Sequence, residues 1–140
     1  LVDRATEIVE FMTQAMLVPS HGDLSGSNIV AGEGGYRIID LENFGERPFF
    51  FDALSLPVAN AQYLGNRALY LAVRAGLFDT DLDRLFSAAG MDNFRRQRTI
   101  ALFAVLVWAL YEAHTDGRLT RELVAERSKP YNLLASDVLA

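Results

Sequence analysis

A chain of 140 residues, of which 51% are hydrophobic and 22% charged, can bury one sizeable core and is too apolar for a disordered tail. Its formal net charge of -5 disfavours nucleic acid and anionic membranes as partners and favours a neutral or cationic ligand. The lack of cysteine excludes a disulfide framework and a cysteine-based zinc site. It also suits a reducing cytosol, so a cytoplasmic protein is expected.

The first predicted element is an amphipathic helix from Val2 to Leu17, in which apolar residues recur at three- and four-residue steps until Pro19 ends it. A loop rich in glycine and serine follows over residues 20–27. Two short β-type runs, 28–31 and 36–40, flank a glycine-rich turn. Together they predict a hairpin whose loop is somewhat longer than the tightest class.

The second half of the chain has helical periodicity. Turn chemistry is predicted from Asn43 to Pro48, and Asp52 is expected to cap the next helix and is a candidate to bond the backbone of the loop at 20–27. The longest apolar stretch, Thr99 to Tyr111, predicts a buried helix and is shorter than the about 20 residues that a membrane span needs. Predicted helices cover 53–64, 67–75, 80–88, 93–114 and 121–127. The expected fold class is therefore mainly α with one short β-hairpin.

Three polar residues around the hairpin suggest metal and phosphate chemistry. Asp23 lies in the loop, Asn28 lies at the entry of the first strand, and Asp40 closes the second. Because the entry and exit of a hairpin lie side by side, Asn28 and Asp40 can offer two oxygens to one hard cation such as Mg²⁺. The set resembles the kinase catalytic loop and its metal-binding Asp, and this resemblance implies phosphoryl transfer, in which one carboxylate orients the acceptor hydroxyl while oxygen ligands hold Mg²⁺ on the phosphates.

Three short motifs resemble the aminoglycoside phosphotransferase and choline kinase-like family, which has a protein-kinase-like fold. They are His-Gly-Asp-Leu at 21–24, Ser-Asn-Ile at 27–29 and Ile-Asp-Leu at 39–41. Asp52 stands where that family places an acidic residue that opens the following helix, and Glu42 is similar to the choline-kinase branch. Ser25 differs, because many relatives carry Lys or His at its position.

The resemblance implies that residues 1–140 form the C-terminal lobe of that fold, with a catalytic loop at 20–28, a metal-binding hairpin at 28–42 and a helical subdomain at 52–136. It implies an enzyme that moves the γ-phosphate of ATP or GTP to a hydroxyl of a small molecule, such as an aminoglycoside, a choline-like amine or a sugar. The family's Gly-rich phosphate loop, its strand-borne Lys and the partner Glu of that Lys are expected in an N-lobe upstream of Leu1. The fragment alone is therefore expected to be inactive.

The resemblance also implies a role for each site residue. Asp23 is the expected catalytic base, and Asn28 and Asp40 are expected to hold Mg²⁺ and, through it, the nucleotide. Glu42 is a further expected metal contact, because alternate residues of a continuing strand share a face with Asp40. His21 is expected to brace the loop through hydrogen bonds.

Other interpretations stay open. A catalytically silent binding or scaffold module would retain the fold, although the intact Asp23, Asn28 and Asp40 argue against it. A metal-dependent hydrolase using Asp23, Asp40 and Glu42 would be expected to show further histidines or carboxylates. The acidic residues at 79, 81 and 83 are interpreted as a solvated helix start.

Overall fold

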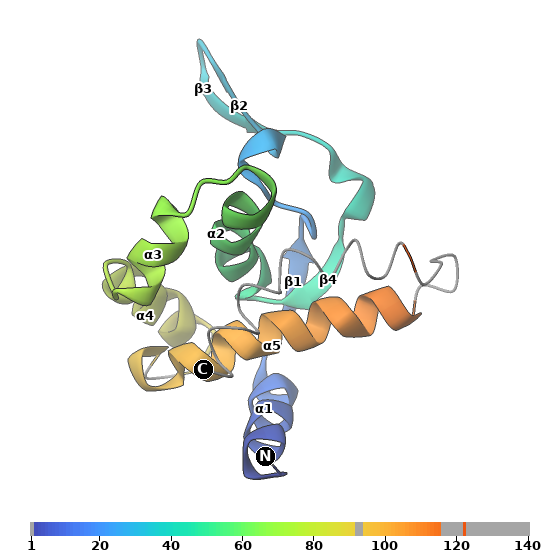
Figure 1. Cartoon of the computed structure of the whole chain (residues 1–140), viewed down its shortest axis with the longest axis vertical. Coiled ribbons are helices and arrows are strands. Elements are labelled where there is room, and N and C mark those ends of the chain that lie inside the picture. The colour runs from blue at the N-terminus through green and yellow to red at the C-terminus, as the bar shows by residue number, and fades with distance from the viewer. Residues whose placement is uncertain (1, 92–93, 116–121, 123–140) are drawn as a thin grey trace.

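A computed structural model describes residues 2–91, 94–115 and 122, and within them the chain is mainly helical (Figure 1). Its helices are α1 (Val2–Gln14), α2 (Phe51–Tyr63), α3 (Ala68–Arg74), α4 (Asp79–Ala88) and α5 (Phe94–Thr115). Its strands are β1 (Leu17–Ser20), β2 (Ile29–Gly32), β3 (Gly35–Ile38) and β4 (Gly45–Pro48). The predicted fold class, mainly α with a short hairpin, is confirmed at this level. The predicted helix at 121–127 falls largely outside the described residues.

A second strand pair, which the sequence did not predict, closes the base of the candidate site. β1 and β4 pair antiparallel, with Leu17 opposite Pro48 and Ser20 opposite Gly45. The expected helix to Leu17 is therefore too long, since α1 ends at Gln14, and the predicted turn before Pro48 contains a strand. These two strands of four residues each are stabilised by each other, and a pairing so distant in sequence leaves little local signal.

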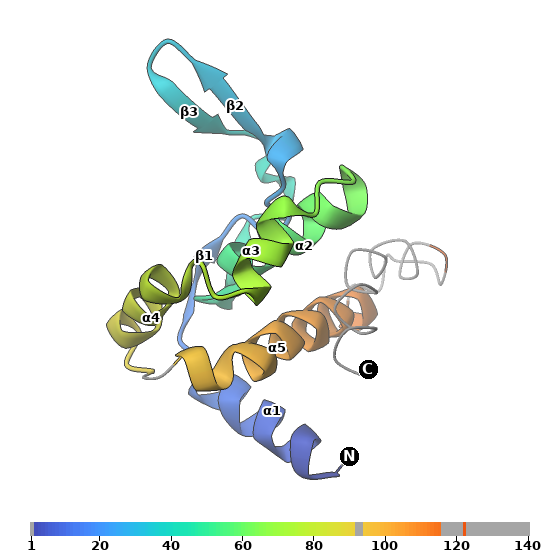
Figure 2. The same cartoon turned by 60° about the vertical axis from the view of Figure 1, so that its left-hand side comes forward.

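The predicted hairpin is present and projects from the helical body in both views (Figures 1 and 2). Ile29 pairs with Ile38 and Gly32 with Gly35, so the connecting loop has only two residues, shorter than expected. Gly35 has a φ of +107°, which glycine adopts without strain. Both faces of the hairpin are open to solvent, and Tyr36 is 81% exposed.

The core below the hairpin is built from side chains of α1, α2, α3, α4 and α5. Phe50 and Phe86 stack at 5.8 Å, Phe49 meets Phe86 edge-on at 4.8 Å, and Phe94 extends the same cluster. Phe49 and Phe50 therefore fix the start of α2 against α4. Trp108 of α5 is only partly buried and packs against the edge of this core.

The structure also bears on the predictions for the apolar stretch Thr99–Tyr111 and for the acidic residues at 79, 81 and 83. None of the helices within the described residues is long and apolar enough to cross a membrane, which agrees with the prediction for the Thr99–Tyr111 stretch. The start of α4 is not simply solvated, because Asp79 forms ion pairs with Arg98 and Arg95 of α5. These pairs fasten α4 to α5.

Candidate active site

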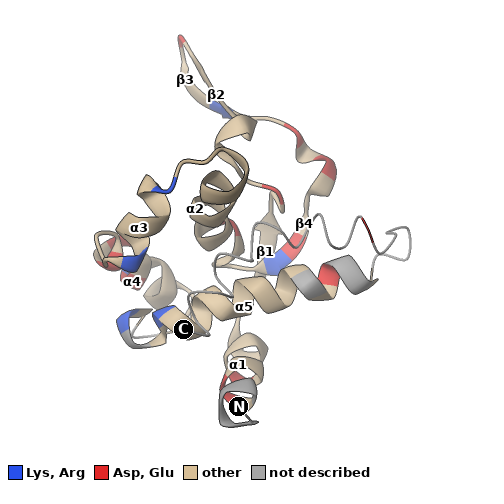
Figure 3. Cartoon of the chain, viewed as in Figure 1, with Lys and Arg blue, Asp and Glu red and all other residues tan. Residues whose placement is uncertain are grey.

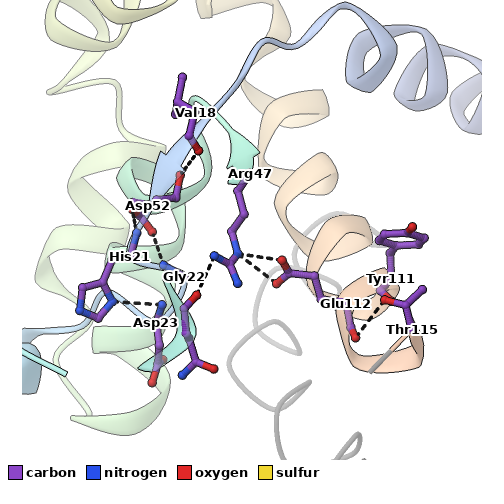
Figure 4. Close-up of polar contacts among 11 residues, drawn as sticks. Val18, His21, Gly22, Asp23, Arg47, Asp52, Tyr111, Glu112 and Thr115 are labelled. Atoms are coloured by element: carbon purple, nitrogen blue, oxygen red, sulfur yellow. Dashed lines mark hydrogen bonds and ion pairs between the residues drawn. The ribbon is translucent and has the colours of Figure 1, made fainter. Parts of the chain in front are cut away.

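The loop between β1 and β2 is held by the side chain of Asp52 in the first turn of α2. The backbone N–H of His21 donates to Asp52 Oδ2 at 2.6 Å, and that of Gly22 donates to Asp52 Oδ1 at 3.0 Å (Figure 4). The expected helix cap at Asp52 is wrong, since α2 already begins at Phe51 and its N-cap is Phe50. The second expectation for Asp52, a bond to the backbone of the loop at 20–27, is confirmed, and two N–H donors to one anion are strong hydrogen bonds.

His21 is buried and uses both ring nitrogens inside the site. Its Nδ1 accepts from the backbone N–H of Asp23 at 3.3 Å, and its Nε2 lies 2.8 Å from the carbonyl of Ile39. Because Nδ1 accepts, Nε2 is the nitrogen that carries the proton and donates to Ile39. The ring therefore links the loop to the end of the hairpin, immediately before Asp40.

Asn28 lies at the entry of β2 and is 8% exposed. Its Nδ2 donates to the backbone carbonyl of Asp23 at 2.9 Å, so Oδ1 is the end of the amide that a cation would meet. Its backbone carbonyl accepts from Ile39 N–H at 2.9 Å, which makes Asn28 and Asp40 near neighbours across the hairpin's open end.

Asp40 has a φ of +63° and is the one non-glycine residue with positive φ among the described residues. It is exposed and directly precedes a short 3-10 helix, Leu41–Asn43. The strand therefore ends at Ile38, and the premise that a continuing strand gives Glu42 the same face as Asp40 is wrong. A left-handed aspartate is strained by roughly 1 kcal/mol or more, and such strain clusters at functional positions.

A buried arginine packs beneath the loop, and sequence reasoning missed it. Arg47 is 8% exposed, donates from Nη1 to the carbonyl of Asn43 at 2.9 Å and pairs through Nε with Glu112 of α5 at 2.8 Å (Figure 4). Gly22, at a φ of +84°, lies against its guanidinium. The sequence offered one sign that this arginine is buried: it directly precedes the apolar run Pro-Phe-Phe-Phe.

Acidic residues surround the open end of the hairpin. Figure 3 shows acidic residues along the segment between β3 and β4, where the sequence has Asp40 and Glu42, and Asp23 is also exposed. Among the described residues, no three His, Asp or Glu side chains form a group that could hold a metal ion. An Asn–Asp pair such as Asn28 and Asp40 is not a group of this kind.

No protein-family model matches this chain, and no curated protein or solved structure matches it either. The functional assignment therefore depends on the residues and contacts described above.

Proposed function

We propose that this chain is the C-terminal lobe of a small-molecule kinase, which transfers the γ-phosphate of ATP or GTP to a hydroxyl group with the help of Mg²⁺. The observation that carries the proposal is one chain of hydrogen bonds. Asn28 binds the carbonyl of Asp23, Ile39 binds the carbonyl of Asn28, and His21 joins Ile39 to Asp23. Hydrogen bonds therefore connect the proposed base Asp23, the proposed amide ligand Asn28 and Ile39, the residue directly before the proposed carboxylate ligand Asp40.

In this proposal each residue has a distinct task. Asp23 takes the proton of the acceptor hydroxyl while the oxygen of that hydroxyl attacks the γ-phosphorus. The bond between the γ-phosphorus and the β,γ-bridging oxygen breaks, and the nucleoside diphosphate leaves with the electron pair. Asn28 and Asp40 would hold Mg²⁺ with one neutral and one anionic oxygen, and the ion would supply positive charge to neutralise the phosphates. His21 keeps the loop in place through the hydrogen bonds of its two ring nitrogens.

A metal-binding experiment tests the proposal on the 140-residue chain itself. Mn²⁺ replaces Mg²⁺ as a paramagnetic probe, and in the presence of ATP we expect it to broaden the NMR signals of Asn28 and Asp40 first. The signal of Gly90, at the far end of α4, serves as the internal control. Asp40→Ala should abolish the broadening, whereas Asp81→Ala, which removes an exposed carboxylate on α4, should not. Equal broadening in both variants would refute the metal site.

An activity assay tests the reaction. The natural protein, with any sequence that precedes Leu1, is incubated with ATP labelled at the γ-phosphate, Mg²⁺ and a panel of aminoglycosides, choline-like amines and sugars. We expect labelled phosphate on at least one hydroxyl acceptor. Intact Mn²⁺ binding with no transfer to any acceptor would instead favour the catalytically silent module.

A further inference from the structure

A second side chain of α2 reaches the loop, at a point that the reaction scheme leaves unexplained. Asn60 Oδ1 accepts from the backbone N–H of Gly26 at 2.6 Å. Asn60 follows Asp52 by eight residues, or about 12 Å along the helix axis, and residues at this spacing share one face of a helix. Asp52 and Asn60 therefore lie on one face of α2, where Asp52 accepts from the N–H groups at the start of the loop and Asn60 accepts from the Gly26 N–H near its end.

Asn60 is itself firmly held. Its backbone carbonyl accepts from the N–H groups of both Leu64 and Asn66, at 3.2 and 3.1 Å, where α2 ends. The helix around it is apolar and buried, with Val58 and Ala61 in the core. Asparagine is a poor residue inside a helix, so its place here is best explained by the hydrogen bond it makes to the loop.

Gly26 fits closely against this part of α2. A Cβ atom at Gly26 would lie 3.1 Å from both Asn60 Oδ1 and a methyl group of Leu64. Gly26 also begins the 3-10 turn Gly26–Asn28, and the N–H of Asn28 donates back to the carbonyl of Ser25 at 3.0 Å. The position of Gly26 therefore sets the position of Asn28.

We infer that Asn60 is a positioning residue for the metal-binding end of the site, acting through Gly26 on Asn28. The inference rests on the proposed function, since it assigns Asn28 to the metal. It divides the work of α2 in two: Asp52 fixes the segment that precedes Asp23, and Asn60 fixes the segment that carries Asn28. Substitution of a residue that orients a metal ligand typically lowers metal affinity about 10-fold to 100-fold.

The test compares Asn60→Leu, which keeps the size of the side chain and removes the acceptor, with Asn60→Asp, which keeps an acceptor oxygen. Asn66→Leu and Asn66→Asp are the matched controls, because Asn66 is an exposed asparagine whose Oδ1 accepts from the N–H of Ala68 and does not touch the loop. They also correct for the charge that aspartate adds. Mn²⁺ affinity in the presence of ATP, hydrogen exchange at the Gly26 amide and thermal unfolding are measured on the natural protein, with any sequence that precedes Leu1.

We expect Asn60→Leu to weaken Mn²⁺ binding by about tenfold and to speed exchange at Gly26, while Asn60→Asp stays near the wild type. Neither control should change Mn²⁺ affinity. Wild-type Mn²⁺ affinity in Asn60→Leu, together with faster exchange at Gly26, would overturn the positioning role alone. Absence of Mn²⁺ binding in the wild type would overturn the proposed function and this inference with it. Should Asn60→Leu not fold, Asn60→Ala is measured against the same expectations.

Discussion

At the scale of single residues, the candidate loop is fixed through its backbone. The N–H groups of His21, Gly22 and Gly26 all donate to side chains of α2, and the carbonyl of Asp23 accepts from Asn28. The side chain of Asp23 is exposed while its peptide groups are tied down. A substitution that changes only its carboxylate should therefore change the chemistry far more than the fold.

Asp23→Ala in the natural protein is predicted to lower turnover by about 10²-fold to 10⁴-fold, the usual contribution of a positioned general base. Nucleotide affinity and thermal stability should stay close to the wild type, because Asp23 is proposed to touch the acceptor hydroxyl and not the nucleotide. Steady-state kinetics with the acceptor identified in the panel, together with calorimetry, measure both. Unchanged turnover would remove Asp23 from the mechanism.

Gly22→Ala is predicted to destabilise the fold by about 1–3 kcal/mol. The φ of +84° is unfavourable for alanine, and the added Cβ would lie 2.3 Å from Arg47 Nη1 and 2.5 Å from the carbonyl of Asn43. Gly34→Ala in the hairpin loop is the control, because nothing lies within 4 Å of a Cβ there. Urea denaturation gives both free energies, and equal values would show that the loop can relax around the methyl group.

At the scale of elements, Arg47 couples β4 to α5. Removing one partner of a buried pair leaves the other charge uncompensated, but Glu112 keeps a 30% exposed side chain, so the expected cost of Arg47→Ala is about 2 kcal/mol. Arg84→Ala is the control, since the Arg84–Asp81 pair joins two exposed side chains at 3.7 Å and such pairs contribute little. Chemical denaturation of both variants measures the difference. A loss for Arg84→Ala as large as that for Arg47→Ala would contradict the coupling.

The sequence predicted the elements whose signal is local. The periodicity of 53–64 and 93–114 gave α2 and α5 to within two residues, and the glycines between two β-type runs gave the hairpin. The β1–β4 pair escaped because Leu17 was assigned to the preceding helix and its partner Pro48, 31 positions away, to a turn. Asp23, Asn28 and Asp40 could be singled out by spacing, whereas Arg47 and Asn60 act through contacts that no local pattern encodes.

At the scale of the whole molecule, the hairpin presents apolar side chains that nothing in the described structure covers. Tyr36 is 81% exposed and Ile38 53%, and a hairpin with two open edges is a template for pairing with another chain. The 140-residue chain is therefore expected to self-associate in a concentration-dependent way. Sedimentation should show that Tyr36→Lys with Ile38→Lys reduces association without lowering the unfolding temperature, and a wild type that stays monomeric at high concentration would contradict this.

The same chain should fold yet bind Mg·ATP only weakly. The core beneath α2 is complete without the hairpin, but the described residues offer a nucleotide only the exposed loop and hairpin. Calorimetry with ATP and Mg²⁺ is expected to give a millimolar or weaker dissociation constant. Micromolar binding to the monomer would mean that these residues build the nucleotide site by themselves.

The β1–β4 pair has a consequence for how the site opens. Residues 21–44 form one continuous segment between β1 and β4, and the pairing of these two four-residue strands holds its ends together. The segment contains His21, Asp23, Asn28 and Asp40. Separation of those strands would release the proposed base and the proposed metal ligands together. We therefore expect the site to be lost and regained as one cooperative unit, at a free energy below that of global unfolding. The hydrogen bonds to Asp52 and Asn60 raise the free energy of this local opening, because both connect the segment to α2, whose residues are buried in the core.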